Sequence, residues 1–174
     1  LFGPSYGSAH RICTGIDLQM VVLGSGEQWC EKELSTLNHE LPNFSAYIGY
    51  DESLSHLVEA GSDFFLMPSR YEPCGLNQMY SLLYGTLPIV RKTGGLVDTV
   101  ENYNEQTGEG TGFILDHLTP QSIYDTVGWA AYAWYNKREH LREMQVRGMK
   151  KKFGWDVSAK KYEDVYKSAL ELKK

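Results

Sequence analysis

The sequence predicts an α/β fold, an open parallel sheet with helices on both faces. Short apolar runs alternate along the chain with segments in which apolar residues recur every three or four positions. The runs are nearly continuous, which is typical of strands that are buried on both faces of a parallel sheet. Glycine or proline residues separate many of these segments, as expected where strands and helices end. The alternation indicates parallel strands joined by crossover helices.

The first half of the chain becomes regular at residue 18. The run 18–23 is rich in β-branched residues and stops at the turn Gly24-Ser25-Gly26, so we expect a buried strand there. Gly61 and Pro68 mark the ends of a later helix and strand. The pattern after the first strand predicts a helix, a strand, a second helix and a third strand over residues 27–38, 44–48, 53–60 and 64–67.

The second half continues the alternation and then becomes helical. A helix from about residue 75 to 84 ends at Gly85, and residues 102–112 are polar and rich in glycine, so a mobile surface loop is expected there. Thr119 followed by Pro120 marks a helix start. The predicted elements are strands at 87–90 and 113–115, a short helix after Gly94-Gly95, and three final helices from Pro120, over 137–151 and over 157–172.

The length of 174 residues fits one domain. We expect residues 1–17 to form an irregular N-terminal segment or shortened linker, because the opening is rich in glycine and serine and has no periodicity. Residues 18–174 are expected to form the folded domain. No internal repeat is present, which excludes solenoids and propellers.

Charge and composition exclude several partners. The 17 Lys+Arg residues against 22 Asp+Glu residues give a net charge of −5, so no basic field is available for nucleic acid. No apolar run approaches the roughly 18 residues of a membrane helix, and no signal peptide is present, so we expect no membrane partner. Three cysteines without a C-x-x-C pair and five scattered histidines argue against disulfides and metal sites, and favour a reducing cytoplasm.

In an open parallel sheet, ligands bind at the carboxyl ends of the strands. The loop after Met67 contains Glu72 and leads into a helix, where the amides of Gly75, Leu76 and Asn77 would attract an anion such as phosphate. The Glu72 carboxylate could accept hydrogen bonds from sugar hydroxyls. From spacing alone, an ordinary acidic residue at a helix start is an equally good interpretation.

Four other positions also have two possible interpretations. The loop after Val90 places Gly94-Gly95 between basic residues and a helix start, which also favours an anion, although it lacks the P-loop spacing. Tyr50 follows a strand and could stack a base for roughly 1–3 kcal/mol, or could be a half-buried tyrosine. The glycines at 24 and 26 are followed by Trp29 where a dinucleotide fingerprint needs a third glycine, so a tight turn is favoured over NAD or FAD binding. Cys74 has no neighbouring histidine, so a backbone role is favoured over a nucleophile.

Three segments together are similar to a known family: Gly49-Tyr50 to Ser55-His56, Pro68 to Gln78, and Tyr84 to Val100. They resemble the bacterial glycogen synthase and plant starch synthase family, specifically its C-terminal nucleotide-sugar-binding domain. The resemblance runs from about residue 18 to the C-terminus and implies a Rossmann-like domain, the C-terminal half of a GT-B fold. Related retaining transferases carry a second glutamate where this chain has Tyr80, which favours the glycogen and starch synthases over the sucrose-phosphate-synthase-like relatives.

The resemblance also implies roles for individual residues. Glu72 is expected to touch the transferred glucose as the catalytic residue, and Tyr50 is expected to stack adenine. The family places an arginine and, five residues later, a lysine at the start of this domain. Arg11 is the candidate for that arginine, but the lysine is absent. Donor binding is further expected from the backbones of Cys74 and Gly75 at the sugar, from the amides of Leu76 and Asn77 at the distal phosphate, and from Thr93, Gly94 and Gly95.

The function implied for the whole protein is a retaining transfer of glucose from ADP-glucose to the non-reducing end of an α-1,4-glucan, without a metal or other cofactor. The family's N-terminal domain is not in this sequence, so the 174-residue chain is expected to be inactive alone. The alternatives are another GT-B retaining transferase that uses a UDP-sugar, and a catalytically silent nucleotide- or glucan-binding module. The expected location is the cytoplasm, or the plastid stroma for a plant enzyme.

Overall fold

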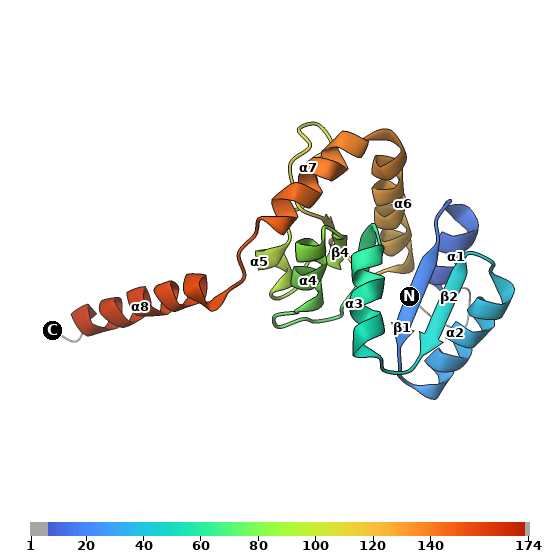
Figure 1. Ribbon diagram of the computed structural model, residues 1–174, viewed down its shortest axis with the longest axis horizontal. Helices are drawn as coiled ribbons and strands as arrows, with labels where there is room; N and C mark the ends of the chain where they lie inside the picture. The colour runs from blue at the N-terminus through green and yellow to red at the C-terminus, as the bar shows by residue number, and fades with distance from the viewer. Residues whose placement is uncertain (1–6, 173–174) are drawn as a thin grey trace.

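A computed structural model describes residues 7–172 as parallel strands flanked by helices (Figure 1). This architecture confirms the predicted α/β fold class. The strands of the described residues are β1 (Met20–Gly24), β2 (Phe44–Ile48), β3 (Phe64–Met67), β4 (Leu87–Arg91) and β5 (Phe113–Leu115). The helices are α1 (Ser8–Gly15), α2 (Gln28–Glu40), α3 (Glu52–Gly61), α4 (Asn77–Tyr84), α5 (Leu96–Thr99), α6 (Pro120–Asn136), α7 (Arg138–Met149) and α8 (Trp155–Leu172).

The strands form two parallel ladders rather than the single one that was expected. β1 pairs with β2, in a register that matches Met20 with Phe44 and Gly24 with Ile48. β4 lies between β3 and β5 in the second ladder. Within residues 7–172 no ladder joins β1 to β3. The ladders are nevertheless linked by packing, because Met20 and Phe64 contact the same apolar cluster.

The larger core lies between the second ladder and helices α6 and α7. Alternate residues of β4 and β5 point to this side, as the twofold period of a strand requires. The 3.6-residue period of α6 supplies the opposing side chains. Burial of each large aliphatic side chain contributes about 1.5–3 kcal/mol. The fully or almost fully buried members include Leu87, Ile89, Phe113, Leu115, Ile123, Ala130 and Met144.

The first described helix corrects the expected boundary of the folded domain. Residues 8–15 form α1, in which Ala9 and Ile12 are completely buried. Their three-residue spacing places both on one face of the helix, which packs against α6. Ile12 belongs to the larger core, and Ala9 belongs to a second, smaller core with residues of α2 and β2. The expectation of an irregular segment through residue 17 is therefore wrong for residues 8–15, and residues 1–6 lie outside the described part of the chain.

The polar segment 102–112 is anchored, contrary to the mobile loop expected from its composition. Tyr103 is 2% exposed, and its hydroxyl lies 2.9 Å from Nδ1 of His140 on α7. Burial raises the pKa of the Tyr103 hydroxyl. Arg147, also on α7, donates to the carbonyl oxygens of Gly108 and Gly110. These contacts give the loop's buried polar groups partners that lie far away in the sequence.

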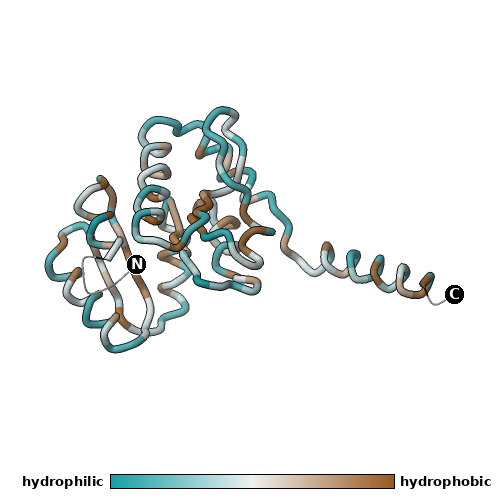
Figure 2. The backbone as a smooth tube through the Cα atoms, turned by 180° about the vertical axis from the view of Figure 1, so that it is seen from behind, coloured by the Kyte–Doolittle hydropathy of each residue, from teal (hydrophilic) through white to brown (hydrophobic). Residues whose placement is uncertain are grey.

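The last helix, α8, extends away from the rest of the molecule (Figure 1) and has no buried residue. Hydrophobic and hydrophilic stretches alternate along it, as Figure 2 shows. Val165, Tyr166 and Leu170 are each more than half exposed. Across residues 7–172, no helix combines the length and the apolar character that a membrane span needs.

Candidate functional site

Two loops meet at the carboxyl ends of β3 and β4. We call residues 68–76 the Glu72 loop and residues 92–95 the Gly94 loop. The amide of Gly95 donates to the carbonyl oxygen of Glu72 at 3.0 Å. A Cβ atom on Gly94 would lie 1.9 Å from that oxygen, and one on Gly95 would lie 2.6 Å from the carbonyl oxygen of Cys74. The adjacent glycines are therefore required for the two backbones to pack together, a role that the sequence analysis missed.

A buried glutamine connects the same two loops from the interior of the protein. Gln78 is 0% exposed, and its Nε2 donates to the carbonyl oxygens of Cys74 and Gly75, each at 3.0 Å. The same nitrogen lies 3.2 Å from Oγ1 of Thr99, which in turn donates to the carbonyl oxygen of Gly95. The sequence analysis also missed Gln78, because its partners cannot be inferred from local spacing.

The Glu72 loop leads directly into the N-terminus of α4. Gly75 has a φ of +75°, a left-handed conformation that glycine adopts without strain. No side chain caps the helix, whose N-cap residue is Leu76. The first amides of a helix have no intrahelical partner and carry the positive end of the helix dipole. The start of α4 thus has no side-chain cap, and anion binding by the amides of Leu76 and Asn77 stays a prediction.

The side chains of the Glu72 loop are accessible. Glu72 is partly exposed, and within residues 7–172 no hydrogen bond or ion pair engages its carboxylate. An ionised carboxylate in this state offers two acceptor oxygens to a ligand. Cys74 is exposed, and its thiol has only a long contact of 3.5 Å with the carbonyl oxygen of Gly75. A backbone role for Cys74 stays a prediction.

Basic residues lie beside the two loops. The guanidinium of Arg91, at the end of β4, donates to the carbonyl oxygen of Arg70 in the Glu72 loop. Lys92 forms an exposed ion pair of 3.6 Å with Asp116. Such a pair contributes little to stability in water, so Lys92 can rearrange at low cost. The neighbourhood of the Gly94 loop is therefore suited to a negatively charged ligand.

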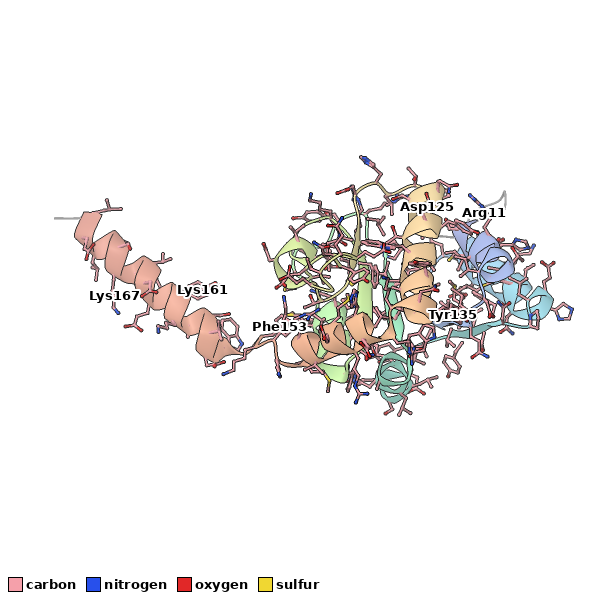
Figure 3. All side chains as sticks on the ribbon, turned by 90° about the horizontal axis from the view of Figure 1, so that it is seen from above. Arg11, Asp125, Tyr135, Phe153, Lys161 and Lys167 are labelled. Carbon is pink, nitrogen blue, oxygen red and sulfur yellow. The ribbon has the colours of Figure 1, made fainter. Side chains whose placement is uncertain are left out.

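Two further predicted site residues, Tyr50 and Arg11, lie apart from the contact between the Glu72 loop and the Gly94 loop. Tyr50 follows β2 and is 86% exposed, beside Asp51, whose carboxylate accepts from the amide of Leu54 at the start of α3. Its ring is open to stacking and is not half-buried. Arg11 lies on α1 against α6 (Figure 3), where it donates to Gln121 at 3.0 Å and stacks over Tyr124. The structure does not bring Arg11 to the loop contact.

An open groove of about 610 Å³ lies between the first turns of α2 and the end of β2. It contains none of the predicted site residues, although Ile48 is two positions before Tyr50. Trp29, which is 53% exposed, had been noted only because it interrupts the glycine pattern. The lining residues are Gln28, Trp29, Glu31, Lys32, Ser35 and Ile48.

A small aromatic cluster covers the outer side of α4. Nδ1 of His56 lies 3.2 Å from the hydroxyl of Tyr84, and its ring packs near Tyr80. Glu59, one turn further along α3, is buried. Burial raises the pKa of the Glu59 carboxyl, and the nearby His56 lowers it in part. This carboxylate takes no part in the contact between the Glu72 loop and the Gly94 loop.

Among the residues that the structure describes, no group of three or more histidine, cysteine, aspartate or glutamate side chains could hold a metal ion.

Comparisons with known proteins agree with the geometry. The family model described as "Glycosyl transferases group 1" matches residues 8–145. The chain is 76% identical over 173 residues to a glycogen synthase of Treponema denticola, covering 99% of this chain and 35% of that protein. It is 49% identical over 162 residues to glycogen synthase 1 of Geobacter metallireducens, covering 92% of this chain and 32% of that protein. The chain thus spans about a third of the length of these curated relatives.

Solved structures are similar in fold. The catalytic domain of starch synthase IV from Arabidopsis thaliana, bound to ADP and acarbose, matches with a TM-score of 0.73 and 24% identity, over 94% of this chain and 42% of that one. A sucrose-phosphate synthase from Thermosynechococcus elongatus matches with a TM-score of 0.59 and 16% identity, over 90% of this chain and 46% of that one. The arrangement of strands and helices is that of one part of a GT-B glycosyltransferase.

Proposed function

This chain belongs to the group 1 glycosyl transferases, and from that premise we propose that it is the donor-binding C-terminal part of a glycogen synthase. The whole protein would transfer glucose from ADP-glucose to the non-reducing end of an α-1,4-glucan with retention of configuration. The observation that carries the proposal is the 76% identity to the Treponema glycogen synthase over 99% of the chain. The accessible Glu72 loop and the uncapped start of α4 support it independently.

The choice of ligands is supported by the structural neighbour. ADP and acarbose are bound to the Arabidopsis starch synthase IV domain, whose fold this chain shares. In our proposal the amides of Leu76 and Asn77 hold the distal phosphate, and Thr93, Gly94 and the sugar-facing backbone of Cys74 and Gly75 complete the donor site. The exposed ring of Tyr50 stacks adenine.

Gly95 was predicted to bind the donor, but its amide has a hydrogen-bond partner within the protein. Gly95 donates its N–H to Glu72, so we assign it to the support of the loops rather than to a ligand contact. Arg11 stays a candidate for the diphosphate only if its contact with Gln121 is released. Neither assignment alters the proposed substrate.

The reaction would be driven mainly by electrostatics. Negative charge increases on the diphosphate as its bond to glucose breaks, so amides aimed at the distal phosphate stabilise the transition state more than the ground state. Glu72 would hold the glucose by accepting hydrogen bonds from its hydroxyls. No metal or other cofactor is part of the proposal. The acceptor glucan and the exclusion of water would require the remaining part of the protein.

We place the protein in the cytoplasm. Cys13, Cys30 and Cys74 are free thiols in the structure, a state that a reducing compartment maintains. The bacterial origin of the two relatives supports the same location.

A calorimetric titration of the 174-residue chain with ADP, UDP and glucose tests the proposal. We expect ADP to bind in preference to UDP. A preference for UDP would favour a GT-B transferase that uses a UDP-sugar. If neither nucleotide binds, the donor-binding role is wrong. A silent nucleotide-binding module is distinguished by joining the chain to the N-terminal part of the Treponema protein, because only a transferase will then incorporate labelled glucose into glycogen.

A further inference from the structure

The carboxamide of Gln78 has an unusual environment at the start of α4. The side chain is completely buried, and its Nε2 donates to two successive carbonyl oxygens of the Glu72 loop, those of Cys74 and Gly75. Its Oε1 is also buried and has no hydrogen-bond partner within residues 7–172. An unpaired buried acceptor is unfavourable, and an apolar side chain would avoid it. The donor function of Nε2 therefore explains a glutamine at this position.

The two carbonyl contacts determine the direction of two amides. The carbonyl and the N–H of one trans peptide unit point in opposite directions, and no cis peptide is present in the described chain. When Gln78 draws the carbonyls of Cys74 and Gly75 towards the interior, the N–H groups of Gly75 and Leu76 turn away from it. That direction leads to the surface, where Leu76 is 54% exposed. The outward N–H groups continue the row of free amides at Asn77.

The orientation of the carboxamide is fixed by its neighbours. If its oxygen and nitrogen exchanged places, Oε1 would face two carbonyl oxygens, and the nearby Thr99 hydroxyl could donate to it only by giving up its bond to the carbonyl oxygen of Gly95. The present orientation also lets Nε2 reach Oγ1 of Thr99 at 3.2 Å. Thr99 donates to the carbonyl oxygen of Gly95, whose N–H donates to Glu72. One side chain therefore supports both the Glu72 loop and the Gly94 loop.

We propose that Gln78 is a positioning residue that orients two backbone amides of the donor site, aiming that of Gly75 at the sugar and that of Leu76 at the diphosphate of the nucleotide-sugar donor. The proposal rests on the proposed function, because it takes a nucleoside diphosphate as the ligand. It adds a residue that does not touch the ligand, and it makes the affinity for phosphate depend on a side chain in the interior.

The test compares ADP with adenosine as ligands of the 174-residue chain. Gln78→Met keeps the length and volume of the side chain but removes the Nε2 donor. We expect ADP to bind about tenfold more weakly, equivalent to about 1.4 kcal/mol, because the amides are no longer held towards the phosphates. Adenosine, which has no phosphate, should bind as it does to the wild type. Thr126→Val is the control for removal of a buried polar group, since Thr126 is also buried but its hydroxyl bonds within α6.

A second variant tests the proposal even if Gln78→Met does not fold. Thr99→Val removes one acceptor of Nε2 and leaves both carbonyl contacts, so a smaller loss of ADP affinity is expected, again without a loss for adenosine. Unchanged ADP binding in the folded variants would overturn the role of Gln78, and so would an equal loss for ADP and adenosine. If the wild-type chain binds no ADP, the proposed function itself is overturned, and this inference with it.

Discussion

The amide nitrogen of Gly95 lies 3.0 Å from the carbonyl oxygen of Glu72, and this hydrogen bond holds two loops that follow neighbouring strands. The contact is between backbones, so the side chain of Glu72 stays available to a ligand. It also depends on the adjacent Gly94, because a Cβ atom at that position would overlap with the same oxygen.

The first prediction concerns Gly94→Ala. The new Cβ would lie 1.9 Å from the carbonyl oxygen of Glu72, and the φ of +46° alone costs alanine about 1–2 kcal/mol. We expect the free energy of unfolding to fall by at least that amount in chemical denaturation, and ADP binding to be lost. Gly61→Ala is the control, because a Cβ there would meet nothing within 4 Å. Equal stability of the two variants would contradict the proposed packing.

The second prediction concerns Tyr50→Ala. Loss of the exposed ring should weaken ADP binding by roughly 1–3 kcal/mol, the contribution of stacking a base on an aromatic side chain. Calorimetric titration measures this change directly. Tyr166→Ala on α8 removes another exposed tyrosine and should leave the affinity unchanged. An unaltered affinity in Tyr50→Ala would remove Tyr50 from the site.

The third prediction concerns Glu72→Gln in the fusion with the N-terminal part of the Treponema protein. The carboxylate is proposed to contact sugar rather than nucleotide, so turnover should fall at least tenfold while ADP affinity is nearly kept. Initial rates of labelled glucose incorporation and an ADP titration give the two values. Glu33→Gln on α2 serves as the control. If activity and ADP affinity fell together, Glu72 would instead be maintaining the shape of the loop.

The fourth prediction is that the 174-residue chain alone transfers no glucose. Transfer requires donor and acceptor to be oriented in a closed cleft with little water, and this orientation lowers the barrier by several kcal/mol. Incubation with labelled ADP-glucose and glycogen should give no incorporation above background. Clear turnover by the chain alone would show that it contains a complete active site.

The fifth prediction is a pH dependence of stability caused by Glu59. Burial raises its pKa in the folded chain, so the folded state holds the proton more tightly than the unfolded state does. The free energy of unfolding should therefore fall as the pH rises from the ordinary carboxyl pKa of about 4.3 to the raised one, and stay lower above it. Glu59→Gln should be more stable than the wild type at pH 7 and similar near pH 4.

Denaturation curves at the two pH values measure this effect. Glu171→Gln, at an exposed position on α8, is the control and should show no such difference. If Glu59→Gln were less stable than the wild type at pH 7, the carboxylate would be making a favourable contact in its charged form.

Local patterns predicted most of the secondary structure. The strands expected at 44–48, 64–67 and 113–115 agree with β2, β3 and β5, and Thr119 accepts a hydrogen bond from the amide of Ser122 at the start of α6, as its capping position suggested. These features depend on residues that are close together in the sequence. The left-handed residue after α4, Gly85, is another example.

Contacts between distant segments could not be predicted in this way. The anchoring of residues 102–112 depends on His140 and Arg147, which lie more than thirty positions away. The division of the strands into two ladders depends on which edges meet in space. The same applies to the site. The positions of its loops were predicted, whereas the exposure of Tyr50 was left open, and the packing of Gly94 on Glu72 and the burial of Gln78 were not predicted.

The two separate ladders have a consequence for the proposed binding of a nucleotide-sugar. Tyr50 follows β2 of the smaller ladder, whereas Glu72 and Gly95 lie in loops that follow β3 and β4 of the larger one. Within the described chain the two ladders are joined by side-chain packing and not by strand pairing, so we expect the smaller unit to open locally more readily than the larger one. A nucleotide-sugar that contacts both units, as proposed, would suppress this opening. Part of its binding energy would be spent on ordering the two units, so the ligand itself would act as a cross-link between them.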